Sequence, residues 1–139
     1  MKKPITDWNK FRDQFVRETL RKASFRWPPR TTAIRNARVD RRSNPATGKD
    51  CWHVKCALCY NVVMEREARL DHIYPVVPLP GVQEEGTASS KLNVGDYVLR
   101  MFPEAAGFQV LCHSCHSAKT KEETGLRAEA RRKAKGVAK

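Results

Sequence analysis

The sequence predicts a small α+β protein whose short strands and helices are held together by a zinc site. Two C-x2-C pairs, Cys56 with Cys59 and Cys112 with Cys115, supply the four thiolates of a closed tetrahedral zinc site. Short β-type segments alternate with segments that have the apolar spacing of amphipathic helices. At 139 residues the chain suits one domain with extensions, and a structural metal would supplement its modest core.

The composition points to a polyanionic partner. The chain carries 27 Lys and Arg against 15 Asp and Glu, a formal net charge of +12. This balance favours nucleic acid over a membrane, although a solvated basic face would give the same count. The apolar runs are too short to span a bilayer, and the first residues do not form a signal peptide. We therefore expect a cytoplasmic protein, in which paired cysteines bind zinc rather than form disulfides.

The N-terminal part is predicted to be helical and basic. A first helix is expected over 6–22, capped by Thr6 or Asp7, with its aromatic residues at helical spacing. After Trp27-Pro28-Pro29 a second helix is expected over 31–39. From position 10 to position 42 there are eleven Lys or Arg and three acidic residues. The basic side of the first helix is either solvated or in contact with phosphate.

The remaining segments divide the chain into three parts. Strands are expected over 60–64, 69–73 and 108–111, a loop over 80–90, and a helix over 92–102. A last helix is expected from Ser114 through Thr120, continuing to Arg132 with a break near Gly125. We assign 1–50 to a basic helical extension, 51–125 to the zinc-stapled core and 126–139 to a basic C-terminal helix or tail.

Two further residues near the first cysteine pair leave an alternative open. Cys51 is the odd cysteine, and His53 lies three residues before Cys56. A ligand set that exchanges a cysteine for His53 stays possible, but the regular spacing of the pairs favours four cysteines.

An Asp-His pair and a histidine after the last cysteine form a candidate catalytic group. Zinc at a strand-to-helix corner would start the last helix at a fixed angle, so that His116 faces Asp71 and His72 across a small cleft. Taken singly, Asp71-His72 reads as a turn pair before proline, and His116 as a spare zinc ligand. An acid and two histidines together are typical of a divalent-metal site.

The order and spacing of these motifs resemble the HNH endonuclease family, especially its small, four-cysteine, zinc-bearing, phage-type members. The resemblance runs from about Cys56 to Glu123 and rests on three motifs: Cys56-x2-Cys59, then Asp71-His72-Ile73-x-Pro75, then Gln109-x-Leu111-Cys112-x2-Cys115-His116-x2-Lys119-Thr120. It implies a ββα-metal core and hydrolysis of DNA phosphodiester bonds by nicking or double-strand cutting. In that family Asp71 and His116 would bind Mg²⁺ or Mn²⁺, and His72 would be the general base.

One position departs from the family pattern. The middle residue, usually Asn or His, orients the general base, and here it is Gly107, which has no side chain. Another group must then hold the base, or activity is weakened. This departure keeps two alternatives open: a non-cutting nucleic-acid-binding or regulatory protein on the same scaffold, and a subunit of a phage DNA-processing machine that depends on its partner protein.

Overall fold

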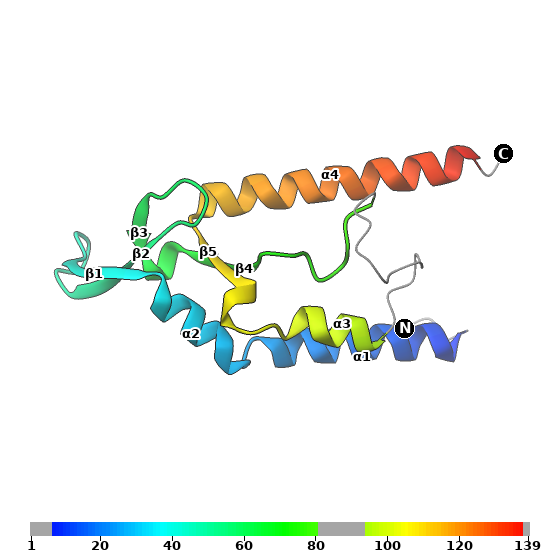
Figure 1. Ribbon diagram of the computed structural model, residues 1–139, viewed down its shortest axis with the longest axis horizontal. Coiled ribbons are helices and arrows are strands. Elements are labelled where there is room, and N and C mark those ends of the chain that lie inside the picture. Colours follow the sequence, from blue (N-terminus) through cyan, green and yellow to red (C-terminus); the bar gives the residue numbers. More distant parts are fainter. Residues whose placement is uncertain (1–6, 81–93, 138–139) are drawn as a thin grey trace, which may run out of the picture.

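The computed structural model describes residues 7–80 and 94–137, which form two small antiparallel sheets, two long helices, α1 and α4, and two short helices, α2 and α3. In Figure 1 the strands lie at one end, α4 follows the upper edge, and α1 follows the lower edge with α3 beside it. The elements in chain order are α1 (Trp8–Ser24), α2 (Pro28–Asn36), β1 (Arg38–Ser43), β2 (Asp50–Lys55), β3 (Val62–Met64), the 3-10 turn η1 (Glu65–Glu67), β4 (Arg69–His72), α3 (Val94–Met101), the 3-10 turn η2 (Ala105–Gly107), β5 (Phe108–Leu111) and α4 (His113–Val137).

Local chemistry explains where the two N-terminal helices begin. Asp7 caps α1, because its Oδ1 accepts a hydrogen bond of 3.1 Å from the backbone N–H of Lys10. The helix expected over 6–22 is therefore present, although Thr6 lies outside the described residues. The second helix begins at Pro28 and ends at Asn36, so its expected range of 31–39 was wrong. Two prolines can occupy the first turn of a helix because the N–H groups there have no helical partner.

A three-stranded antiparallel sheet in the order β1-β2-β3 follows α2. Residues 38 and 39, expected to end a helix, instead begin β1. The β1–β2 hairpin turns at 44–49, where the carbonyl of Asn44 accepts from the N–H of Gly48 at 2.8 Å and Gly48 has a φ of +68°. The expected domain boundary between residues 50 and 51 falls inside β2, which begins at Asp50. β1, which belongs to the N-terminal part, pairs with this strand.

A second, two-stranded sheet leads into the last helix. β4 and β5 are antiparallel, with Asp71 opposite Gln109 and His72 opposite Phe108. The expected strands in these positions are confirmed, and 108–111 matches residue for residue. α4 then runs from His113 to Val137 without the break expected near Gly125, so the boundary between 125 and 126 lies inside one helix. The expected loop over 80–90 and the start of the helix over 92–102 lie largely outside the described residues.

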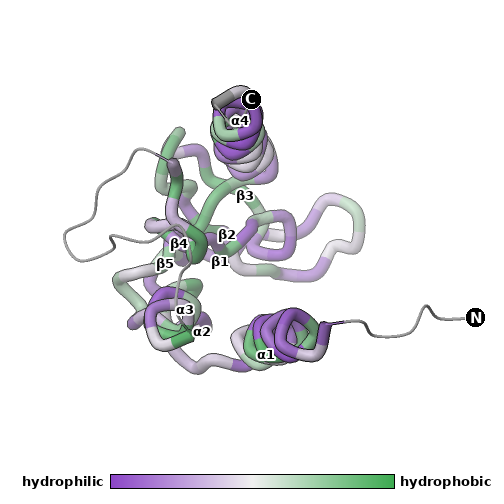
Figure 2. Tube along the Cα trace, turned by 90° about the vertical axis from the view of Figure 1, so that its right-hand side faces the viewer, coloured by the Kyte–Doolittle hydropathy of each residue, from purple (hydrophilic) through white to green (hydrophobic). Residues whose placement is uncertain are grey.

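The core is small and sits where the two sheets meet the first turn of α4. Its centre is Cys56, Leu111 and Cys112, with Val63 and Cys115 packed against them. Figure 2 shows hydrophobic trace concentrated in the strands, whereas α4 and α1 are mostly hydrophilic. None of the described helices combines the length and apolar composition that a membrane span requires.

Candidate functional site

Four cysteines from the two C-x2-C pairs converge at the base of α4. The Sγ atoms of Cys56, Cys59, Cys112 and Cys115 all lie within 4.8 Å of one another, and those of Cys59 and Cys112 are 3.7 Å apart. Four sulfurs about 2.3 Å from one zinc would be separated by about 3.8 Å, so the residues fit this metal. The cluster can hold a structural metal ion, as the spacing of the cysteines predicts.

The protonation of the cysteines is uneven. The hydroxyl of Ser114 lies 3.2 Å from the Sγ of Cys112 and lowers the pKa of that thiol to about 6. Hydrogen bonding to the neighbouring sulfurs, that of Cys112 first, raises the pKa of Cys115 to about 12. Without a metal, ionisation therefore favours Cys112 over Cys115, and it also favours Cys56, where burial alone would raise the pKa but backbone hydrogen bonds lower it. Metal binding would release the proton of Cys115, because a thiolate is the ligand.

The alternative ligand His53 does not join this cluster. Its Nδ1 lies 3.3 Å from the backbone carbonyl of Cys51, on β2, and the side chain is buried. Among the described residues, the four cysteines form the one group of three or more Cys, His, Asp or Glu that gathers around a common point. Cys51 also stays outside it.

Asp71 faces α4 from the end of β4. Its Oδ2 is 2.6 Å from the Nζ of Lys119 and 3.4 Å from the amide nitrogen of Gln109, its cross-strand neighbour. Lys119 also contacts the Oε1 of Glu123 at 2.7 Å and the carbonyl of His72 at 3.3 Å. Burial alone would lower the pKa of Lys119, but the hydrogen bonds to Asp71 and Glu123 outweigh it and raise that pKa. Within the described residues, the hydrogen bond and the ion pair of Asp71 both use Oδ2 rather than its second oxygen, Oδ1.

His72 is held by a backbone carbonyl. Its Nε2 lies 3.1 Å from the carbonyl oxygen of Met101, and because a carbonyl only accepts, Nε2 carries the proton. Nδ1 is then the nitrogen with a free lone pair. Burial lowers the pKa of His72, the positive charges of Arg30 and Lys119 lower it further, and the Met101 carbonyl and Asp71 oppose the shift. The imidazole is therefore neutral near neutral pH.

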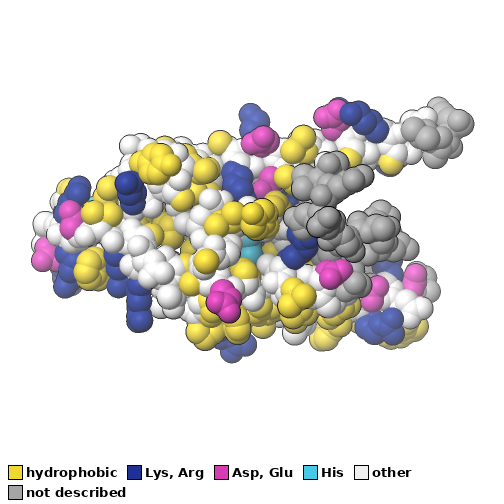
Figure 3. Space-filling view, viewed as in Figure 1, with side chains coloured by type: hydrophobic (Ala, Val, Ile, Leu, Met, Phe, Trp, Pro, Cys, Tyr) yellow, Lys and Arg dark blue, Asp and Glu magenta, His cyan; other side chains and the backbone are white. Residues whose placement is uncertain are grey.

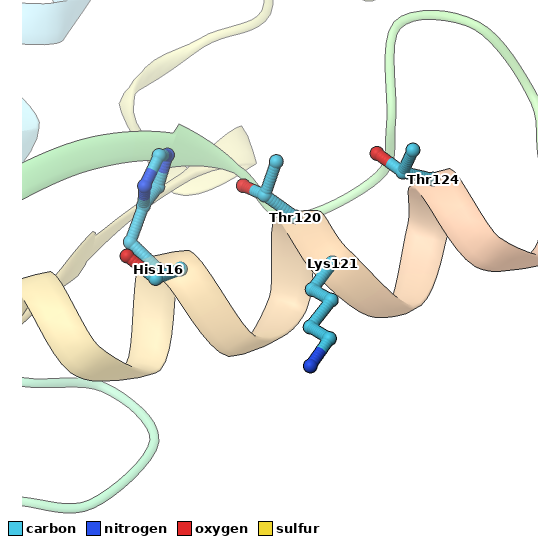
Figure 4. A pocket seen from close by; sticks show the side chains of 5 residues that line it. His116, Thr120, Lys121 and Thr124 are labelled. Carbon is cyan, nitrogen blue, oxygen red and sulfur yellow. The ribbon is translucent and has the colours of Figure 1, made fainter.

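His116 projects from α4 one turn before Lys119. In Figure 4 its side chain points to the same side of the helix as those of Thr120 and Thr124, whereas Lys121 points away. These side chains, together with Ser117, line a shallow groove. Helical spacing also puts His116 in one row with Lys119 and Glu123, at i, i+3 and i+7. The structure thus brings the Asp71 carboxylate and the backbone carbonyl of His72 against Lys119, one turn after His116. The groove beside His116 is lined by residues of α4, and among the described residues Asp71, His72 and His116 do not gather around a common point.

Gly107 braces the end of β4 through its backbone rather than through a side chain. Its carbonyl accepts from the N–H of Ile73 at 3.0 Å, and its N–H donates to the carbonyl of Glu104 at 2.9 Å. A Cβ at position 107 would lie 2.6 Å from the Cβ of Pro103, so there is no room for a side chain. The imidazole of His72 is held by the carbonyl of Met101 instead. Sequence reasoning missed Met101 because a backbone carbonyl leaves no mark in a residue pattern.

Basic side chains are frequent on the two long helices and at the β1–β2 end of the molecule. α4 contains seven Lys or Arg and three Glu, and α1 contains five Lys or Arg and two acidic residues. Figure 3 shows basic side chains over the β1–β2 end of the molecule and along α4, with a histidine visible near the middle of the same face.

Comparisons of the chain with protein-family models, with curated proteins and with solved structures found no match.

Proposed function

We propose that this protein is a metal-dependent endonuclease of the HNH type that hydrolyses phosphodiester bonds of DNA. The observation that supports the proposal is the β4–β5–α4 unit, in which Lys119 of α4, one turn after His116, contacts the Asp71 carboxylate and the backbone carbonyl of His72 at the end of β4. The four-cysteine cluster supports it, because a metal there would fix the start of α4 and with it the direction of His116.

In this proposal His72 is the general base. Its Nε2–H is engaged by Met101, so Nδ1 can accept a proton from a water molecule as the water oxygen attacks phosphorus. Burial favours the neutral imidazole, the form that a base requires. The new P–O bond forms as the P–O bond to the leaving sugar oxygen breaks, and the leaving oxygen takes the bonding electrons and then a proton from solvent.

Asp71 and His116 would hold the catalytic cation. A carboxylate oxygen and an imidazole nitrogen suit Mg²⁺ or Mn²⁺, and Oδ1 of Asp71 is available while Oδ2 remains with Lys119. A bound divalent cation would polarise the phosphate and stabilise charge on the leaving oxygen.

The test is cleavage of supercoiled plasmid by the purified protein with Mg²⁺ or Mn²⁺. Wild type should cut, EDTA should stop it, and His72→Ala should lower the rate at least about 100-fold. His113→Ala, which removes an exposed histidine from the start of the same helix, is the matched control and should cut like wild type. His72→Ala must keep its zinc content and melting temperature. Cutting by His72→Ala at the wild-type rate would refute the assignment.

Binding of DNA without cutting by any of these proteins would favour the second candidate, a nucleic-acid-binding protein on the same scaffold. Gly107 is the feature that kept this candidate open. The hydrogen bond from His72 to Met101 argues against the binding-protein candidate. A general base needs its imidazole held in one tautomer, whereas a protein that only binds nucleic acid does not.

A further inference from the structure

Arg30 is a half-buried cation on α2, close to the Asp71–His72 end of β4. None of the sequence motifs includes it. The guanidinium carbon of Arg30 lies 5.3 Å from the ring centre of Phe25 and 5.4 Å from that of Phe108. The first ring belongs to the residue that ends α1 and the second to the buried first residue of β5. Both distances are in the range of cation–π contacts, so two aromatic rings fix where this charge lies.

Arg30 lacks the anionic partner that its neighbours have. Arg38 makes two hydrogen bonds to Glu65, at 2.6 and 2.9 Å, and Lys119 contacts Asp71 and Glu123. Within 7–80 and 94–137, no carboxylate pairs with Arg30. Burial lowers the pKa of Arg30, which means that its surroundings disfavour the charge they enclose. A guanidinium has five N–H donors, and aromatic faces satisfy none of them in the plane of the group. An anion at this place would relieve that cost.

The position of Arg30 relates it directly to the candidate base. Phe108 pairs with His72 across the β4–β5 ladder, and the two rings are 4.8 Å apart. The guanidinium of Arg30 lies over the same Phe108 ring. Two ring contacts therefore link α2, β5 and β4 through Phe108. The guanidinium lies close enough to His72 for its charge to lower the pKa of that imidazole.

We propose that Arg30 binds the phosphate at which the duplex is cut. The inference rests on the proposed function, because the ligand is identified as the phosphate on which His72 would act. The planar fork of an arginine matches two non-bridging phosphate oxygens, and the aromatic contacts hold the fork before the substrate arrives. The alternative is that Arg30 only packs Phe25 against Phe108.

The test uses Arg30→Gln and Arg30→Lys, with Arg66→Gln as the control. Arg66 is an exposed arginine of η1, so this control removes the same charge without the aromatic contacts. Binding is measured in the non-cutting His72→Ala background, with a duplex of about 25 base pairs, as the slope of log affinity against log salt concentration. Cleavage rates are measured separately with His72 intact, and melting temperatures are taken for every variant.

We expect Arg30→Gln to reduce the steepness of the salt slope by about 0.9, the value for one phosphate contact, and to lower kcat about 100-fold. Arg30→Lys should keep the slope, because it keeps the charge, but recover only part of kcat, because an ammonium lacks the fork. Arg66→Gln should change neither quantity.

A lower melting temperature for Arg30→Gln with an unchanged salt slope would assign the residue to packing and overturn the proposal. If wild type binds the duplex and does not cut, the proposed function fails, and the salt slope of Arg30→Gln still decides whether Arg30 contacts phosphate. The two failures are therefore distinguishable.

Discussion

The Nε2–H of His72 donates a hydrogen bond of 3.1 Å to the backbone carbonyl of Met101, the last residue of α3. The carbonyl is itself well placed: Met101 is buried, and the indole N–H of Trp27 donates to the carbonyl of Pro103 at 2.6 Å two residues later. Helix α3 and the link to α2 therefore position the imidazole of β4. Residues outside the sequence motifs thus fix the orientation of the His72 imidazole.

The first prediction concerns pH. Burial, the first cause, lowers the pKa of His72 below the usual value of about 6.5, with Arg30 and Lys119 acting in the same direction. The neutral base therefore persists below pH 6.5 and is lost only as the pH falls further. We expect kcat/KM to be flat near neutral pH and to reach half its maximum on the acid side at a pH below about 6.5.

The same pKa can be measured without DNA, from the chemical shifts of the His72 ring in an NMR titration. Agreement between the NMR and kinetic midpoints would identify His72 as the group that titrates. An NMR midpoint at or above pH 7 would contradict the prediction, and it would do so even in an inactive protein.

The second prediction concerns Gly107. Adding one methyl group in Gly107→Ala brings a Cβ to within 2.6 Å of Pro103, whose carbonyl accepts from Trp27. Because neither the ring nor the backbone can yield freely, we expect the free energy of unfolding to fall by about 1–3 kcal/mol. Gly107→Asn should be no better, so restoring the family residue would harm this protein.

Gly125→Ala is the matched control for that substitution. Gly125 lies inside α4 with nothing within 4 Å of an added Cβ, so alanine should raise the free energy of unfolding by about 1 kcal/mol. Urea unfolding monitored by circular dichroism gives both values. Equal stability of Gly107→Ala and wild type would show that the loop yields.

The strands and caps of this fold could be predicted where one local signal dominates. The run over 108–111 is apolar and bounded, and it is a strand; Asp7 has the chemistry of a cap, and it is one. β1 was missed because its six residues include three arginines and one aspartate, so no alternation of apolar side chains marks it. It forms because β2 offers it a pairing edge, with Trp52 beneath Arg38 and Arg41.

The candidate site also combines a feature that the sequence predicts with contacts that it does not predict. The cysteine spacing predicts the cluster, since four identical ligands at fixed intervals leave few other arrangements. The contact of Asp71 with Lys119 and the burial of Arg30 between two rings depend on how α4 and α2 pack on the strands. Such contacts are tertiary, so a single sequence does not contain them in readable form. The catalytic roles of Asp71, His72 and His116 stay predictions.

The third prediction concerns Lys119, the cation between Asp71 and Glu123. In Lys119→Met two partly buried carboxylates lose their shared partner, and we expect a loss of about 1–3 kcal/mol in the free energy of unfolding at neutral pH. Part of the loss should be recovered at low pH, where the carboxylates are protonated. Lys133→Met is the control, because Lys133 pairs with Glu129 at 2.8 Å on the exposed surface and should change stability little.

Thermal unfolding of both variants at several pH values measures these effects. Equal stability of Lys119→Met and Lys133→Met would show that the contacts around Asp71 contribute no more than a surface ion pair.

The last prediction concerns the metal of the four-cysteine cluster. We expect the purified protein to contain about one zinc per chain, and a strong chelator to lower its melting temperature sharply, because a core of this size depends on the metal.

Cys59→Ser should lose most of the zinc. Cys59 is the exposed member of the cluster, so its loss removes a ligand without emptying the core. Cys51→Ser removes a cysteine outside the cluster and should keep the full zinc content. Zinc release by acid should also be steep in pH, because a proton competes with the metal at each of several thiolates. Metal analysis of the three proteins decides the point: equal zinc in both variants would exclude Cys59 as a ligand, and no zinc in wild type would leave the cluster as packed thiols.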